Sequence, residues 1–144
     1  LISVKVIRIF AYSGYYIVLI IQTNAKVLSS RTHLIKLPFV FIGRCADYAL
    51  EDYPNVVSVF ITGDEEDKIK RISELYDVDE AKAKDLMVKT DKRRSSYYNY
   101  YSNKKWGSAA SYDLCINSSA VGIEGAVDMI LDFVKKKEEQ KVSG

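Results

Sequence analysis

The chain has 144 residues, 48% of them hydrophobic, and a formal net charge of +2. This length suits one domain, because a chain of this size buries about two thirds of its unfolded surface; we expect a single domain over residues 1–144. The only histidine is His33, and the two cysteines, Cys45 and Cys115, form no C-x-x-C motif. Neither a disulfide framework nor a zinc site is indicated, so we expect a cytoplasmic protein that supplies no metal ligands of its own.

The first third of the chain contains two apolar stretches. Residues 4–10 (VKVIRIF) are rich in β-branched residues and predict a strand. Residues 15–21 (YYIVLII) predict a buried element, because a span across a bilayer needs about 20 apolar residues. We therefore expect no membrane partner.

Two further strands are predicted over residues 39–43 (FVFIG) and 56–63 (VVSVFITG). Both are nearly continuous apolar runs, which is typical of strands that are covered on both faces in a parallel sheet. Asp64 follows the second strand and is a good N-cap for a helix over residues 65–76, whose apolar residues share one face.

Asp79 is expected to cap a second helix over about residues 80–90, which consists of strong helix formers. Residues 112–118 (YDLCINS) predict a fourth strand, and apolar residues at helical spacing predict a last helix over about residues 123–137. Strands that alternate with helices indicate an α/β fold with a mainly parallel sheet flanked by helices. In such sheets ligands bind beyond the carboxyl ends of the strands.

Residues 90–106 (TDKRRSSYYNYYSNKKW) gather five bases, five aromatic rings and one acid, so this run has a formal charge of +4 and the other 127 residues have −2. A local basic field usually attracts an anion such as phosphate; a solvated helix face is the alternative. At helical spacing Lys89, Lys92 and Arg93 share a face and Arg94 points elsewhere. We expect the rings to pack the run onto the domain, with stacking on a nucleobase as the alternative.

Two stretches carry more specific motifs: FIGRCADYALEDYPNVVSVFITGDEEDKIKRI, which begins at residue 41, and KTDKRRSSYYNYYSNKKWGSAASYDLCINSSAVGIEG, which begins at residue 89. Together they resemble the cytidylate kinase-like family of P-loop phosphotransferases, and the resemblance covers roughly residues 39–134. It implies a P-loop kinase-like fold with a helical lid over about residues 71–95. It also implies ATP with Mg²⁺ as the donor and a nucleoside monophosphate, cytidylate first, as the acceptor.

On the acceptor side, such kinases present an arginine from a strand that ends in Gly-Arg, which corresponds here to Gly43 and Arg44. The resemblance implies that Arg44 holds the acceptor phosphate. Asp47 is a candidate for orienting the acceptor, and Asp91 for orienting an arginine or a ribose hydroxyl. An acceptor phosphate oxygen is already a competent nucleophile, so no general base is required.

On the donor side, the family's lid carries bases that close over the triphosphate. Such bases suit phosphoryl transfer, which depends mainly on positioning and on neutralising charge. Asn117 and Ser118 match the loop that lies against the donor base. The residues implied to stabilise the transferring phosphoryl group are Arg71, Lys92, Arg93 and Arg94.

Residues 8–16 (RIFAYSGYY) occupy the place of the family's glycine-rich phosphate loop, and Ser13 and Gly14 are the implied remnant of the donor site. The loop departs from the usual form, because it contains bulky tyrosines and no lysine follows it. The resemblance places several acceptor-binding helices at this point of the chain, and only residues 22–38 stand in their place. The altered loop predicts poor donor affinity, weak binding of cytidine nucleotides and little or no phosphoryl transfer.

Two other interpretations remain open. A catalytically weak nucleotide-binding pseudokinase would keep the fold and the lid and bind nucleotides without forming product. A single-stranded nucleic-acid-binding module would use the basic and aromatic run to hold a strand. The net charge of only +2 counts against the second interpretation, so a nucleic acid is not the expected partner.

Overall fold

The structure is a computed structural model that describes residues 16–21, 39–42, 45–52 and 56–142. The strand expected over residues 4–10 lies outside the described residues. In chain order the elements are β1 (Tyr16–Ile21), β2 (Phe39–Ile42), α2 (Ala46–Ala49), β3 (Val56–Thr62), α3 (Glu65–Tyr76), α4 (Glu80–Ser102), the 3₁₀ turn η1 (Ala109–Ser111), β4 (Leu114–Asn117) and α5 (Ser118–Val142).

The four described strands form one sheet in the order β2-β1-β3-β4. β3 and β4 are parallel, with Val59 opposite Leu114 and Ile61 opposite Ile116. β1 is antiparallel to both β2 and β3. The α/β class is confirmed, but among these strands the expected parallel pairing holds only for β3 and β4. An apolar run indicates that a strand is covered on both faces and carries no information on its direction.

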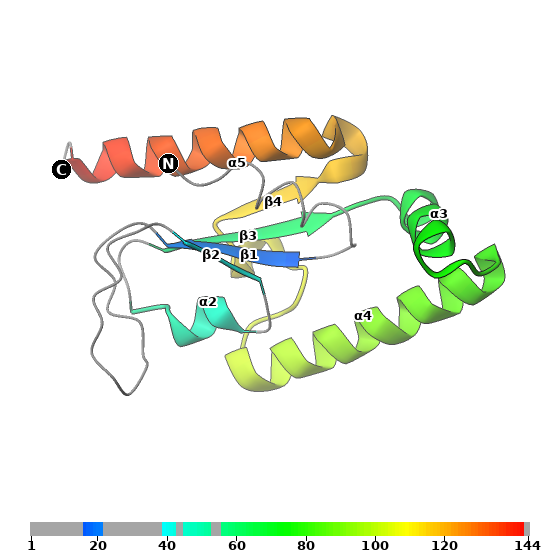
Figure 1. Cartoon of the computed structure of the whole chain (residues 1–144). Helices are drawn as coiled ribbons and strands as arrows, with labels where there is room; N and C mark the ends of the chain where they lie inside the picture. Colours follow the sequence, from blue (N-terminus) through cyan, green and yellow to red (C-terminus); the bar gives the residue numbers. More distant parts are fainter. Residues whose placement is uncertain (1–15, 22–38, 43–44, 53–55, 143–144) are drawn as a thin grey trace.

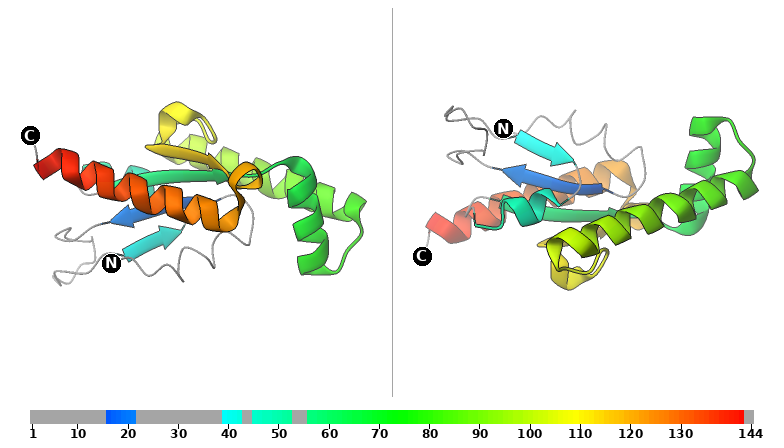
Figure 2. Two further views of the ribbon diagram at one scale, coloured as in Figure 1. Left: turned by 90° about the horizontal axis from the view of Figure 1, so that it is seen from above. Right: turned by 90° about the horizontal axis from the view of Figure 1, so that it is seen from below.

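Helices cover the two faces of the sheet in separate layers. α5 lies over one face, and α2 and α4 lie on the other (Figures 1 and 2). α3 and α4 form a helical hairpin that extends beyond the end of the sheet to which β3 points (Figure 1). This hairpin includes the range expected for the lid, residues 71–95, and is longer than that range at both ends.

β3 is buried from both sides because its alternate residues face different helices. Val57, Val59 and Ile61 point toward α5 and pack in one core with Ile116 of β4. Phe60 points to the opposite face. It belongs to a second core that also contains Cys45, Tyr98, Tyr112 and the partly buried Trp106. The expectation that this strand is covered on both faces is confirmed.

The helix caps divide into one that forms and one that does not. The Asp79 carboxylate accepts the backbone N–H of Lys82 at 2.7 Å and caps α4 as expected. Asp64 occupies the N-cap position of α3, but its side chain makes no capping bond and accepts from Asn117 instead. α4 also continues twelve residues beyond the expected end at residue 90, to Ser102, so that it is about 35 Å long.

The last helix is confirmed from about residue 123, and a separate first turn that was not expected precedes it. α5 runs over Ser118–Val142, with an interruption at Gly122, whose φ of 72° lies in the left-handed region. Glycine adopts this conformation without the steric cost that a side chain would add. Gly122 thus separates the first turn, which follows β4 directly, from the long segment that covers the sheet. None of the described helices has both the length and the apolar character that crossing a membrane requires.

Candidate functional site

The candidate site lies where the parallel strands β3 and β4 end, since the carboxyl ends of parallel strands meet at one edge. Ser118 Oγ donates to the carbonyl oxygen of Thr62 at 2.8 Å, and Asn117 Nδ2 donates to Asp64 Oδ1 at 2.9 Å. The backbone N–H of Asp64 donates to Ser119 Oγ at 2.8 Å. Side-chain bonds therefore hold Asn117 and Ser118, the residues expected near the donor base, at the end of β3.

Gly63 lies at the point where these groups come closest. A Cβ at this position would lie 3.2 Å from Ser119 Oγ, 3.5 Å from Ser118 Oγ and 3.8 Å from Lys68 Cγ. The absence of a side chain lets the strand end, the two serines and the first turn of α3 approach one another. Lys68 is thereby brought to the edge of the sheet.

A half-buried group of charges joins α3 to α4 near this edge. Arg94 Nη1 lies 3.3 Å from Asp91 Oδ1, and their side chains are 29% and 21% exposed. Burial raises the pKa of Asp91, although the positive charges of Arg94 and Lys68 oppose this change. Burial lowers the pKa of Lys68, and Asp91 opposes that change. Partly desolvated charges of this kind are frequent at functional sites, and structural ion pairs are the other common case.

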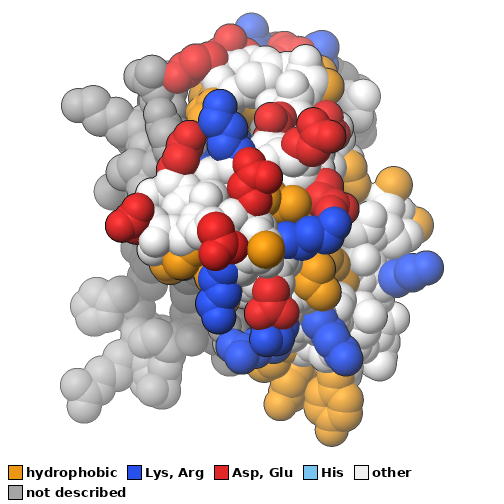
Figure 3. Space-filling view, turned by 90° about the vertical axis from the view of Figure 1, so that its right-hand side faces the viewer, with side chains coloured by type: hydrophobic (Ala, Val, Ile, Leu, Met, Phe, Trp, Pro, Cys, Tyr) orange, Lys and Arg blue, Asp and Glu red, His pale blue; other side chains and the backbone are white. Residues whose placement is uncertain are grey.

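The four bases implied for phosphoryl transfer do not share one environment. Arg71 and Arg94 are half-buried, whereas Lys92 and Arg93 are exposed. The predicted division between Arg94 and the other bases of α4 is confirmed, and it is Arg94 that lies in the charged group between the helices. Seen from the end of the hairpin, most Lys and Arg side chains lie in the lower half of the molecule, with a few at the top, and Asp and Glu lie mostly in the upper half (Figure 3).

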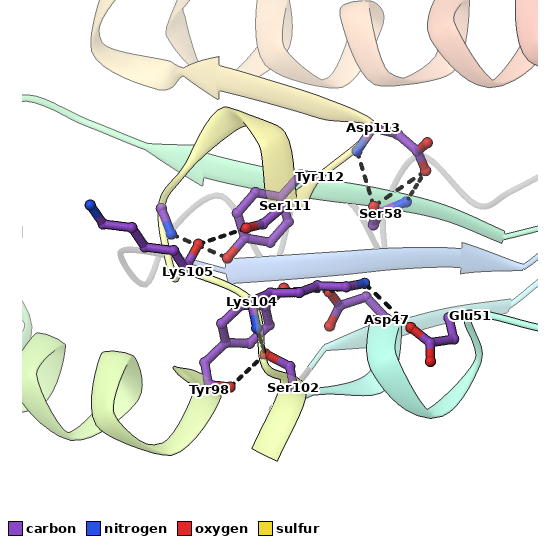
Figure 4. Close-up of polar contacts among 11 residues, drawn as sticks. Asp47, Glu51, Ser58, Tyr98, Ser102, Lys104, Lys105, Ser111, Tyr112 and Asp113 are labelled. Atoms are coloured by element: carbon purple, nitrogen blue, oxygen red, sulfur yellow. Dashed lines mark hydrogen bonds and ion pairs between the residues drawn. The ribbon is translucent and has the colours of Figure 1, made fainter. Parts of the chain in front are cut away.

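Asp47 lies buried between α2 and α4, with only 3% of the residue exposed. Its Oδ2 accepts from Tyr98 Oη at 2.6 Å, and Lys104 Nζ is 3.9 Å from the same oxygen (Figure 4). Its Oδ1 has no hydrogen-bond partner in the part of the chain that the structure describes. The structure thus places Asp47 in contact with the base of the hairpin, and its expected role toward an acceptor stays a prediction.

The aromatic residues of the run divide between the core and the surface. Trp106 makes an edge contact with Phe60 at 5.3 Å between ring centroids, and Tyr98 stacks with Tyr112 at 5.8 Å. These rings pack the base of α4 onto the domain, as expected. The tyrosines that stay exposed contact one another along α4 and are Tyr97, Tyr100 and Tyr101.

Three of the implied site residues, Arg44, Ser13 and Gly14, lie outside the described residues. Their assignment to the acceptor phosphate and the donor loop therefore stays a prediction. Within the described ranges, no three His, Cys, Asp or Glu side chains come together as metal ligands. Mg²⁺ in kinases is usually bound by the nucleotide phosphates with one or two carboxylates, and Asp64 is an exposed carboxylate at the carboxyl edge.

The sequence analysis did not identify Lys68 and Ser119 as site residues. Lys68 precedes Arg71 by three positions, so helical spacing could have shown that the two bases share a face of α3. Ser119 acts on the backbone of Asp64, which is 55 positions away in the sequence. That contact depends on the pairing of β3 with β4, and no local sequence signal indicates it.

No curated protein matches the chain significantly. The crystal structure of an uncharacterised protein from Eubacterium ventriosum ATCC 27560 superposes on this chain with a TM-score of 0.63, and the two sequences are 44% identical. The match covers 65% of this chain and 58% of that chain. The chain therefore spans less than two thirds of that relative. The model of the cytidylate kinase-like family matches residues 19–120, which is most of the chain, and the chain belongs to this family.

Proposed function

We propose that the chain is a nucleotide kinase-like phosphotransferase that moves a phosphoryl group from ATP to CMP or a similar nucleoside monophosphate. Membership of the cytidylate kinase-like family supports the class of reaction. The observation that carries the proposal is the half-buried group of Lys68, Asp91 and Arg94, in which Lys68 lies next to Gly63 at the end of β3. Phosphoryl transfer needs positioned cations of this kind, because negative charge spreads over the phosphoryl oxygens in the transition state.

Each side chain has a role in this proposal. Arg71 and Arg94 stabilise the transferring phosphoryl group, and Asp91 fixes the orientation of Arg94 through their ion pair. Lys92 and Arg93 are exposed on a different face of α4 from Arg94, so on closure they would contact other phosphate oxygens of the nucleotides than Arg94 does. Arg44 would hold the acceptor phosphate with the two-pronged geometry of a guanidinium. The residues proposed for the donor are Ser13, Gly14, Asn117 and Ser118.

Mg²⁺ would arrive with ATP, neutralise the phosphate oxygens and be held mainly by them. Among the described residues, Asp64 fits an outer contact to the ion, and its Oδ1 accepts from Asn117. Because Asn117 fixes that carboxylate beside the strand ends, Asp64 would keep a constant position as the nucleotide binds.

The test is a coupled assay with ATP, Mg²⁺ and CMP on the wild-type chain, Arg94→Gln and the control Lys70→Gln. Lys70 lies on the exposed side of α3, and its replacement removes the same charge. We expect slow wild-type turnover, below the roughly one per second at the low end of ordinary kinases. Removing a positioned charge typically lowers the rate about 10²–10³-fold, so Arg94→Gln should show this loss and Lys70→Gln should not.

Calorimetry separates the other outcomes. Binding of CMP and ATP without formation of CDP would identify a nucleotide-binding pseudokinase, the alternative that the tyrosine-containing loop at residues 8–16 suggests. If neither nucleotide binds, the proposed function is wrong.

A further inference from the structure

A buried polar contact connects α2 to the base of the hairpin. We call Asp47, Tyr98 and Lys104 the hairpin junction (Figure 4). Asp47 is 3% exposed and Tyr98 is 2% exposed, and the Tyr98 hydroxyl donates to Asp47 Oδ2 at 2.6 Å. A carboxylate buried to this extent destabilises the protein unless it is hydrogen-bonded. The bond therefore restricts where the base of α4 can lie relative to α2.

The surroundings of Tyr98 hold its side chain in place and keep its hydroxyl protonated, so that it is the donor in the bond to Asp47. Ser102 Oγ donates to the Tyr98 carbonyl oxygen, and the Tyr98 ring stacks on Tyr112. The Tyr112 hydroxyl accepts in turn from the backbone N–H of Gly107 at 3.2 Å. Burial, and after it the bond to Asp47, raise the pKa of Tyr98 far above its usual range. Tyr98 is therefore protonated at neutral pH and acts as the donor to Asp47.

The junction also has pairing capacity that this geometry does not use. Lys104 Nζ lies 3.9 Å from Asp47 Oδ2 and 3.8 Å from Glu51 Oε2, and both distances are too long for hydrogen bonds. Asp47 Oδ1 has no partner among the described residues. Lys104 follows the end of α4 by two residues, and a displacement of its Nζ by about 1 Å toward Asp47 would bring the two within hydrogen-bonding distance. Lys104 and Asp47 Oδ1 can therefore each form a hydrogen bond that this geometry lacks.

The position of the junction connects the two proposed nucleotide sites. α2 is the first described element after β2, the strand expected to deliver the acceptor-binding arginine. On the other side, Arg94 precedes Tyr98 by about one turn of α4. A shift of α2 that is transmitted through the junction therefore moves the helix that carries Arg94.

We propose that Asp47 is a positioning residue that couples acceptor binding to the placement of α4 through Tyr98 and Lys104. This inference rests on the proposed function. Coupling of this kind makes CMP and ATP bind cooperatively, and each nucleotide must raise the affinity of the other by the same factor.

The experiment measures binding of a non-hydrolysable ATP analogue by calorimetry, with and without saturating CMP. The matched pair of variants is Tyr98→Phe and Tyr100→Phe, which remove the same hydroxyl from the same helix; Tyr100 is 78% exposed. In the wild type and Tyr100→Phe, CMP should tighten analogue binding at least about fivefold, the lower end of usual couplings. In Tyr98→Phe the factor should fall below about twofold, with little change in the affinity for either nucleotide alone.

Asp47→Asn serves if Tyr98→Phe does not fold. The amide keeps an oxygen that can accept from Tyr98 and removes the charge that attracts Lys104, so the variant should fold and show a smaller coupling factor than the wild type. An unchanged factor in the folded variants overturns the inference. Independent binding of the two nucleotides to the wild type also overturns it and leaves the proposed function standing. Absence of any nucleotide binding overturns both.

Discussion

The ends of β3 and β4 depend on single residues whose side chains bond to the backbone of the neighbouring segment. Ser118 bonds to the carbonyl of Thr62, and Ser119 accepts the N–H of Asp64. The Ser119 bond is the one that depends on Gly63: a Cβ there would lie 3.2 Å from Ser119 Oγ, closer than an ordinary contact, whereas its 3.5 Å distance to Ser118 Oγ would be ordinary. A methyl group at this one position therefore disturbs the contact between the sheet and the first turn of α3.

We predict that Gly63→Ala destabilises the protein by about 1–3 kcal/mol, the usual effect of overpacking a close contact. Urea unfolding followed by circular dichroism measures this change. The matched background is Ser119→Ala, which removes the oxygen that the new methyl group would contact. The effect of Gly63→Ala should be smaller in this background; equal effects in both backgrounds would contradict the explanation.

At the scale of elements, α4 shows why the sequence predicted only the first part of this helix of the hairpin. The sequence predicts the helix over about residues 80–90, which are strong helix formers, whereas the second half of α4 contains Ser, Asn and Tyr residues, which are weaker ones. The structure continues the helix because Tyr98 and Ser102 are buried against the domain. Tertiary packing therefore decides the length of this helix, and local propensity does not.

The same limit applies to the contacts of the site. Asp91 and Arg94 are three residues apart on one helix, so the sequence could predict that Asp91 would orient an arginine. Asp47 and Tyr98 are 51 positions apart, and their bond requires the packing of α2 against α4. The apolar sequence of β1 likewise predicted a buried element and did not specify the antiparallel direction in which it lies between β2 and β3.

The two N-terminal aspartates of the hairpin helices provide a test of capping. We predict that Asp79→Ala destabilises the protein by about 1 kcal/mol, because α4 loses the bond from the Lys82 N–H. The control is Asp64→Ala, because the Asp64 side chain makes no capping bond. It is measured in an Asn117→Ala background, so that the loss of the bond from Asn117 to Asp64 does not contribute to the difference. Urea unfolding should show a clearly smaller effect for the control; similar effects would mean that the Asp79 bond contributes little.

At the scale of the whole molecule, the two ends of the sheet differ in how they are held. At the amino end of β3, Lys137 Nζ donates to the Val56 carbonyl at 2.9 Å and lies 3.0 Å from Asp113 Oδ2. The same carboxylate oxygen accepts the backbone N–H of Ser58 at 2.8 Å. These bonds connect α5, β3 and the start of β4. At the opposite end the hairpin leaves the sheet, and α3, all of whose residues are described, has no buried residue.

This difference predicts that the hairpin opens more easily than the rest of the domain. α3 and the first half of α4 have few buried anchors, chiefly Ala83 and Met87, whereas β3 and α5 share one continuous core. Segments with few buried apolar contacts open at lower free energy. Without ligand, amide hydrogen exchange should therefore be faster in Glu65–Tyr76 and the first half of Glu80–Ser102 than in β3 and the long segment of α5.

The second half of α4 is the internal control for this prediction, because it belongs to the same helix and is anchored by Tyr98 and Ser102. It should exchange more slowly than the first half. Addition of the ATP analogue with CMP should slow exchange in α3 and the first half of α4, if the hairpin closes over the nucleotides as a lid. Exchange in the free protein as slow as that of β3 throughout the hairpin would show instead that α3 and α4 form a rigid part of the domain, and the half-buried bases would then have to meet the nucleotides without any closing movement.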